Sequence, residues 1–270
     1  MSETATQLLK EGDLDGALQA LQAAVRSAPA DAKLRVFLFQ VLCILGDWKR
    51  AIAQLKLCAE LDPRAIPMAQ TYREAIICEL HRARVFAGET APMVLGDPQQ
   101  WLALLIQAQG HLARGEVAQA DALRSQAFDM APASPGEIDG TRFEWIADAD
   151  MRLGPVLEAV INGRYFWVPF RAIRSLSLDP PEDLRDSVWM PAQIQLVSEG
   201  EVVALIPTRY PGTVEHGSAA EKLARATGWT EAGAGLYTGI GQRVLSCDTV
   251  EVALMDARRI VLDPVPAEAG

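Results

Sequence analysis

Two stretches of the chain decide the fold of its first half: GDLDGALQALQAAVRSAP (residues 12–29) and GDWKRAIAQLKLCAELDP (residues 46–63). They match at an offset of 34 residues, and the matched pairs are Gly12 and Gly46, Ala17 and Ala51, Leu21 and Leu55, and Pro29 and Pro63. Each stretch opens with a Gly-Asp pair, which permits a tight turn and lets the aspartate cap a helix. Each ends at a proline, which stops that helix. The repeat therefore predicts helix–turn–helix pairs.

This period is typical of tetratricopeptide units, which stack into a curved array. A third copy follows the second at an offset of 69 residues, with matches at Gly115, Ala120, Ala127 and Pro132. Between the copies, apolar residues at helical spacing predict a degenerate helix pair over Pro67–Phe86 and Pro98–Ala113. We expect residues 1–132 to be all helix, with turns at Gly12, Gly46 and Gly115. The alternative is an ordinary helical bundle in which the spacing arose by chance.

The first helix of the second repeat, about Lys33–Leu45, is apolar around much of its circumference. A helix needs only one apolar stripe to pack against its neighbours, so the remainder could face a ligand or be covered by other parts of the chain. In a stacked array such helices line a concave groove that can receive a partner helix. We expect Phe37, Val41 and Ile44 to bind a partner in this groove.

The second half of the chain has a different pattern. Pro135, Gly136 and Gly140 mark a turn-rich linker over residues 133–140. Residues 155–161 and 164–168 flank Asn162-Gly163 and predict a β-hairpin, because Asn-Gly tolerates the positive φ angles of a type I′ turn. Further strands are expected over residues 173–178, 192–197, 202–206, 243–247 and 250–262, with one helix over 219–227. This indicates an α+β fold, with tetratricopeptide-like helical repeats over 1–132 and a compact β-rich domain over 141–270.

Composition narrows the possible partners. The chain has 270 residues, 25 Lys and Arg against 35 Asp and Glu, and a net charge of −10. Residues 1–135 have a net charge of −2 and residues 136–270 one of −8. Without a basic cluster, neither nucleic acid nor an anionic membrane is expected as a partner. The longest apolar stretch, Val36–Leu45, is too short to span a bilayer, and the N-terminus lacks the features of a secretory signal, so we expect a cytoplasmic protein.

Several residues could in principle form a reactive site. Asp148, Asp150 and Asp186 could bind a metal or catalyse an acid-dependent hydrolysis, or they could be helix caps and ion-pair partners of Arg152 and Arg185. The glycines of residues 233–241 could cradle a phosphate or form a turn, and His216 with Ser218 lacks the Gly-x-Ser-x-Gly elbow of a hydrolase. The cysteines form no Cys-x-x-Cys pair and the histidines have no metal-ligand spacing. We expect neither a metal nor a cofactor.

Arg209 and Tyr210 precede the rigid turn Pro211-Gly212. An exposed arginine and tyrosine beside such a turn would anchor a partner protein. The alternative is a structural turn in which Arg209 pairs with an acid. The tryptophans at 145, 167, 189 and 229 are expected mainly in the core of the second domain.

A family resemblance rests on several motifs of the second half, which are WIADADMRLGPVLE (residues 145–158), GRYFWVPF (163–170), DLRD (183–186), WMPA (189–192) and PTRYPG (207–212). Together with the preceding repeats, these motifs resemble the ImpE/SciE/TagJ family of bacterial type VI secretion accessory proteins. The motif residues without an assigned role are Asp148, Asp150, Arg152, Gly154, Trp167, Pro169, Arg185, Trp189, Pro191, Pro211 and Gly212.

The resemblance implies a non-enzymatic adaptor between the small subunit of the contractile sheath and the ClpV-type AAA+ unfoldase. Two alternatives stay open at this point. One is an acid-dependent hydrolase using Asp148, Asp150 and Asp186, and the other is a generic peptide-binding repeat scaffold.

Overall fold

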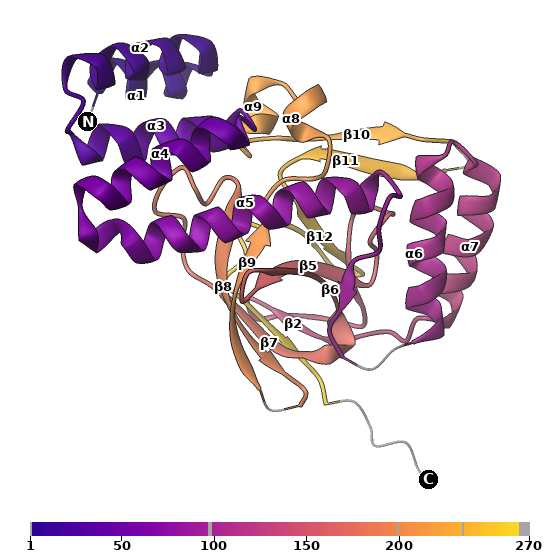
Figure 1. Cartoon of the computed structure of the whole chain (residues 1–270). Helices are drawn as coiled ribbons and strands as arrows, with labels where there is room; N and C mark the ends of the chain where they lie inside the picture. Colours follow the sequence, from indigo (N-terminus) through magenta and orange to yellow (C-terminus); the bar gives the residue numbers. More distant parts are fainter. Residues whose placement is uncertain (1, 97–98, 199, 234, 265–270) are drawn as a thin grey trace.

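The computed structural model describes residues 2–96, 99–198, 200–233 and 235–264. Its first half is mainly helical (Figure 1), with seven α-helices in the described residues up to 130: α1 (Glu3–Glu11), α2 (Leu14–Ser27), α3 (Ala32–Ile44), α4 (Trp48–Leu61), α5 (Ile66–Phe86), α6 (Gln100–Ala113) and α7 (Val117–Met130). The expected helices over 67–86 and 98–113 are therefore present. Residues 97–98, where the second of these was expected to begin, lie outside the described residues.

The three repeat glycines end helices as predicted. Gly12, Gly46 and Gly115 have φ angles of 82°, 70° and 76°, in the left-handed region that favours glycine. The aspartates that follow the first two glycines cap the next helix: Asp13 Oδ1 accepts the Gly16 N–H at 2.8 Å, and Asp47 Oδ1 accepts the Arg50 N–H at 3.2 Å. The first half is thus built from the local signals that the repeat contains.

The expectation that residues 1–132 are all helix is wrong at one point. Met93–Val94 form strand β1, which pairs in parallel with Phe166 and Trp167 of strand β6. The segment between α5 and α6 therefore joins the sheet of the second half. Its two residues are too few to produce the alternation by which a strand is recognised.

The second half contains a nine-stranded sheet with the order β1-β6-β5-β9-β8-β7-β14-β2-β3. After β1, its strands in chain order are β2 (Gly136–Ile138), β3 (Thr141–Phe143), β5 (Val156–Ile161), β6 (Arg164–Pro169), β7 (Ile173–Leu178), β8 (Trp189–Leu196), β9 (Glu201–Pro207) and β14 (Arg259–Leu262). The expected linker over 133–140 is thus corrected, because residues 136–138 form β2 and pair with β14 and β3.

The hairpin of β5 and β6 is confirmed, with Val156 opposite Pro169 and Ile161 opposite Arg164. Asn162 and Gly163 have φ angles of 50° and 70°, as a type I′ turn requires.

Residues 213–262 form shorter and more numerous elements than expected. The single strand expected over 250–262 is two short strands, β13 (Glu251–Ala253) and β14. The helix expected over 219–227 is the shorter α9 (Ala219–Lys222), preceded by α8 (Thr213–His216). Two further small sheets are present: β10 (Thr227–Glu231) with β11 (Tyr237–Gly241), and β13-β12-β4, in which β12 is Val244–Cys247 and β4 is Ile146–Asp148.

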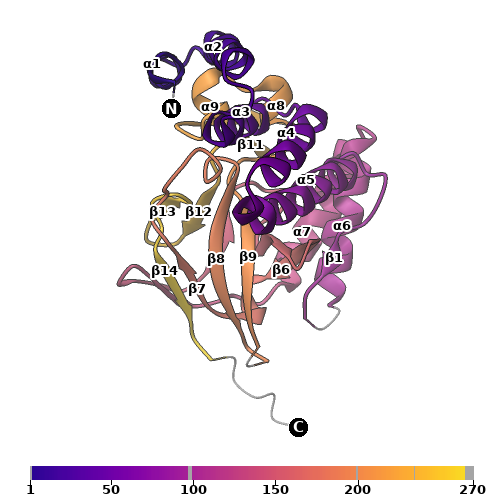
Figure 2. The same ribbon diagram turned by 60° about the vertical axis from the view of Figure 1, so that its left-hand side comes forward.

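Helices and sheet share their hydrophobic cores. Figure 2 shows α5 lying beside the upper part of the sheet, next to β9 and β6, with α3 and α4 above it. Trp189 of β8 is fully buried among residues of α3, α4 and α5, and Trp167 of β6 is fully buried with residues of α5, α6 and α7. None of the helices in the described residues combines the length and the apolar character that a membrane crossing needs.

Candidate functional site

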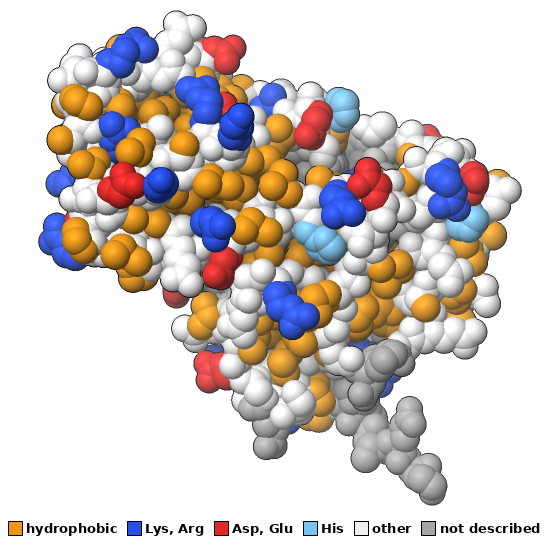
Figure 3. All heavy atoms as spheres, viewed as in Figure 1, with side chains coloured by type: hydrophobic (Ala, Val, Ile, Leu, Met, Phe, Trp, Pro, Cys, Tyr) orange, Lys and Arg blue, Asp and Glu red, His pale blue; other side chains and the backbone are white. Residues whose placement is uncertain are grey.

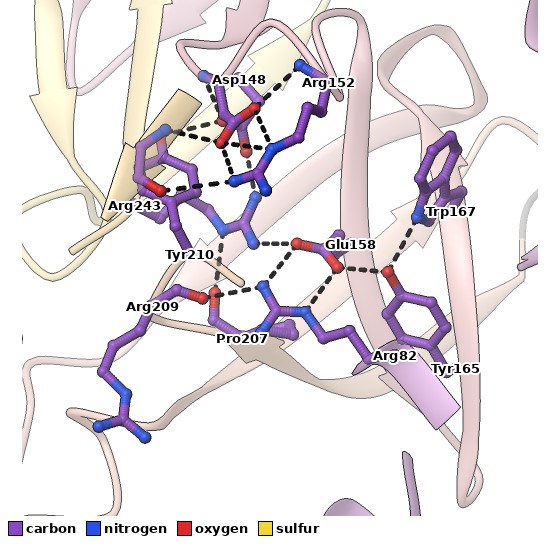
Figure 4. A network of polar contacts seen from close by, with 12 residues as sticks. Arg82, Asp148, Arg152, Glu158, Tyr165, Trp167, Pro207, Arg209, Tyr210 and Arg243 are labelled. Atoms are coloured by element: carbon purple, nitrogen blue, oxygen red, sulfur yellow. Dashed lines mark hydrogen bonds and ion pairs between the residues drawn. The ribbon is translucent and has the colours of Figure 1, made fainter. Parts of the chain in front are cut away.

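A buried network of charged side chains joins the helices to the sheet (Figure 4). Arg82 of α5 donates to both carboxylate oxygens of Glu158 on β5, from Nε to Oε1 at 2.7 Å and from Nη2 to Oε2 at 2.8 Å. Arg243 contacts Glu158 from the other side and also pairs with Asp148 of β4. All four side chains are at least 94% buried. Because unpaired buried charges are very costly, this network must form as a unit.

Neutral groups complete the coordination of these charges. The Tyr165 hydroxyl donates to Glu158, and the Trp167 indole N–H donates to the Tyr165 oxygen at 2.8 Å. Arg82 Nη2 also donates to the Arg209 carbonyl at 2.8 Å. Burial raises the pKa of Glu158, but the two arginines outweigh it and lower that pKa to about 2. Glu158 is therefore a structural anion.

Asp148, a member of this network, and the neighbouring Asp150 accept further hydrogen bonds. Asp148 Oδ1 accepts the Tyr210 hydroxyl at 3.0 Å and the Asp150 N–H at 2.9 Å. Burial raises the pKa of Asp148 to about 6, although Arg243 opposes the shift. Asp150 pairs with Arg152, with an Nη2 to Oδ2 distance of 2.5 Å, and accepts the Gly239 N–H at 2.8 Å. Of the two alternatives for these aspartates, Asp150 thus follows the ion-pair one, with Arg152 as its partner.

Asp186 belongs to a separate turn. Its Oδ2 accepts the backbone N–H groups of Glu182 and Asp183, at 2.6 and 2.9 Å. The expected partner Arg185 pairs with Asp183 instead, and its guanidinium lies 4.8 Å from the centre of the Tyr72 ring. Among the described residues, no group of three or more His, Cys, Asp or Glu side chains is arranged to hold a metal ion.

Similar proteins show the family and the fold of this chain. A family model described as ImpE protein matches residues 140–261, and one described as tetratricopeptide repeat matches residues 8–74. The chain is 51% identical to the type VI secretion system accessory component TagJ of Pseudomonas aeruginosa, over 97% of this chain and 92% of that protein. The chain belongs to the ImpE family. The crystal structure of protein VPA1032 from Vibrio parahaemolyticus has the same fold, with a TM-score of 0.88 and 28% identity over 97% of this chain and 98% of that one.

Most of the ImpE motif residues are buried in the core or shape turns and strand ends. Trp167 and Trp189 are fully buried, and the Trp189 indole N–H donates to Glu79 Oε1 of α5 at 3.1 Å. Gly154 has a φ of 53°, and a side chain there would begin 2.5 Å from the Phe128 ring of α7. Pro169 ends β6, Pro191 lies on β8, and Gly212, with a φ of 90°, follows Pro211 and precedes α8. The motifs therefore hold the helices against the sheet.

The expectation that Arg209 and Tyr210 are exposed is wrong. Both side chains are buried, with 4% and 1% of their surface exposed. Arg209 Nη1 donates to the Ile44 carbonyl at 2.8 Å and to the Lys222 carbonyl at 2.7 Å, and Nη2 donates to the Cys43 carbonyl at 3.2 Å. It satisfies the last carbonyls of α3 and forms no ion pair with an acidic side chain of the described residues, so the expected pairing with an acid is not observed. A cation is favourable at this end of a helix, and burial lowers the pKa of Arg209 to about 10.

The expectation that α3 lines an open groove is also wrong. Phe37, Val41 and Ile44 are 7%, 0% and 0% exposed, because neighbouring helices and Trp189 cover α3 from Phe37 to Ile44. A partner cannot reach these side chains in this structure. The excess of apolar residues on α3 reflects a central helix.

The two remaining motif candidates are structural as well. Gly239 and Gly241 lie on β11 and pack closely on Tyr210 and the Ala226 carbonyl, and residue 234 of the proposed phosphate loop lies outside the described residues. His216 ends α8, whereas Ser218 caps α9 in a reciprocal bond with Glu221.

Among the described residues, two of the exposed apolar surfaces were not predicted from the sequence and matter for binding. One is the outer side of α5, with Ile66, Ile77 and Leu80 at 45–49% exposure, and Figure 3 shows hydrophobic atoms along α4 and α5 with Lys and Arg among them. The other is a groove of about 490 Å³ between the end of α7 and β4, with Trp145 at its rim. Trp145 and Trp229 are more than 40% exposed, so the expected core role holds only for Trp167 and Trp189.

Proposed function

We propose that this ImpE-family chain is a non-enzymatic adaptor of a bacterial type VI secretion system. In this proposal it acts in the cytoplasm and connects the small subunit of the contractile sheath with the ClpV-type AAA+ unfoldase. The observation that supports the proposal most is the 51% identity, over nearly the whole chain, to an accessory component of such a system.

The architecture is consistent with an adaptor. An adaptor with separate surfaces on one rigid body holds one partner in a defined position relative to the other. The network of Arg82, Glu158 and Arg243 fixes α5 to the sheet, and Arg209 fixes the end of α3 to the turn after β9. The exposed side of α5 and the groove beside β4 are therefore held at a fixed separation.

The same network argues against the hydrolase alternative. A general acid or base must reach its substrate with a free proton position. Asp148 and Asp150 are 3% and 0% exposed and pair with arginines, and Asp186 is bonded to its own turn. These carboxylates hold the protein together.

The test is a bridging experiment with three purified proteins. The small sheath subunit is immobilised, and the unfoldase is passed over it with and without this chain. We expect more unfoldase to be retained when the chain is present, and retention to saturate with its concentration. If the chain binds neither protein, or binds both without increasing retention, the adaptor proposal is wrong.

A further inference from the structure

The groove beside β4 is the largest apolar depression described above. Its walls are the end of α7 and the segment after it, including Phe128 and Pro132, and the β4 region, including Trp145, Ala147 and Met151. β4 is the outer strand of the sheet β13-β12-β4, so no further strand of the described residues covers that side. An apolar groove with an aromatic rim is a typical anchor site in protein interfaces.

Exposed carboxylates lie next to residues on the β4 side of this groove. Glu144 precedes Trp145, and its backbone N–H is bonded to Asp248 Oδ1 at 2.9 Å. Glu251 is bonded to the hydroxyl of Ser246, which lines the groove. All three acidic residues are exposed.

The nearby arginines do not offset this charge. Arg142 is paired with Asp263 through two bonds of 2.9 and 2.7 Å, and Arg152 is paired with Asp150. The local excess of negative charge agrees with the net charge of −8 over residues 136–270.

We propose that this groove binds a short basic segment of a partner protein. Apolar side chains of that segment fill the groove between α7 and β4, and its Lys or Arg side chains face Glu144, Asp248 and Glu251. The inference rests on the proposed function and assigns this surface to the small sheath subunit. Complementary charges at the rim accelerate association, and the apolar centre provides most of the affinity.

The exposed side of α5 is the other candidate surface for this partner. The groove beside β4 and the α5 surface differ in the charge of the residues around them. Ile77 and Leu80 lie among side chains of both signs on that helix, Arg73, Glu74 and Arg84, and Arg84 is paired with Glu89 at 3.2 Å. That stripe therefore has no excess of negative charge to attract a basic segment. A basic segment therefore favours the groove.

The anchor is tested by titrating the small sheath subunit into the full chain. Trp145→Ala should weaken binding about tenfold or more, the usual effect of losing an aromatic anchor. Trp229→Ala is the matched control, since Trp229 is 43% exposed and Trp145 41%, and it should bind within about threefold of the unaltered protein. Equal affinity of the Trp145→Ala variant and the unaltered protein would overturn the assignment.

The charge is tested separately, in variants whose exposed substitutions leave the fold intact. Glu144→Lys combined with Glu251→Lys should weaken binding about tenfold at low salt and flatten its salt dependence, whereas Glu201→Lys on β9 should do neither. A loss caused by Leu80→Asp instead would move the site to α5 and overturn the groove. If the unaltered chain does not bind the sheath subunit at all, the proposed function fails and this inference fails with it.

Discussion

At the scale of single residues, the arginines of this protein fall into two groups with different consequences. Arg243 is fully buried and faces two carboxylates, Asp148 and Glu158, which lie 95 and 85 residues before it in the chain. Arg142 is exposed and pairs with one carboxylate, Asp263, at the surface. Solvent and salt screen the second pair but not the first.

Arg243→Met should therefore destabilise the protein by about 3–5 kcal/mol, because two buried carboxylates lose their shared cation. Urea unfolding followed by circular dichroism measures this loss. Arg142→Met is the control and should leave the unfolding midpoint nearly unchanged. Similar midpoints for the two variants would show that the buried network does not stabilise the fold.

One residue of this network, Glu158, could have been recognised from its position in the sequence. Glu158 lies within the apolar strand Val156–Ile161, and a lone carboxylate in such a strand needs a buried partner. Its partners Arg82 and Arg243 are 76 and 85 residues away along the chain. No local spacing identifies contacts of that range, so the partners become evident only from the fold.

At the scale of elements, the turns of the second and third repeats form a natural comparison. Gly46 and Gly115 occupy equivalent positions, with φ angles of 70° and 76°. A side chain at position 46 would begin 2.4 Å from Val214 of α8, whereas position 115 has nothing within 4 Å. The two glycines therefore share their backbone requirement and differ in their surroundings.

Gly115→Ala should cost about 1–2 kcal/mol, the strain of a left-handed alanine. Gly46→Ala should cost about 1–3 kcal/mol more, because the added carbon also displaces α8. Chemical denaturation of both variants gives the two values. Equal costs would mean that the turn of the second repeat is free to move away from α8.

The difference between local backbone requirements and tertiary surroundings also explains how far the elements could be predicted from the sequence. Local signals predicted the repeat turns and the hairpin at Asn162-Gly163, because glycine and asparagine specify those turns by themselves. The short strand β2 and the pair β10–β11 were missed. β2 exists because Ile138 pairs with Ile260 of β14, more than a hundred residues later. The groove beside β4 was missed for the same reason, since its two walls come from different elements.

At the scale of the whole molecule, the helical half depends on the β-rich half for its core. Val188, Trp189 and Leu223 belong to the same hydrophobic cluster as the buried residues of α1–α5. Arg209 supplies the bonds to the last carbonyls of α3, and Glu158 neutralises Arg82 of α5. Removing the second half would expose this apolar surface to water and remove the side-chain donor to the last carbonyls of α3.

We therefore expect residues 1–132 alone to lack a cooperative unfolding transition, although repeat arrays often tolerate truncation. The full chain should unfold in one step, with circular dichroism and tryptophan fluorescence giving coincident curves. Both are measured by thermal and urea denaturation of the fragment and the full chain. A fragment that unfolds cooperatively at the same midpoint as the full chain would contradict this dependence. The two halves would then be linked domains, and the fixed separation between the α5 surface and the groove beside β4 would lose its structural basis.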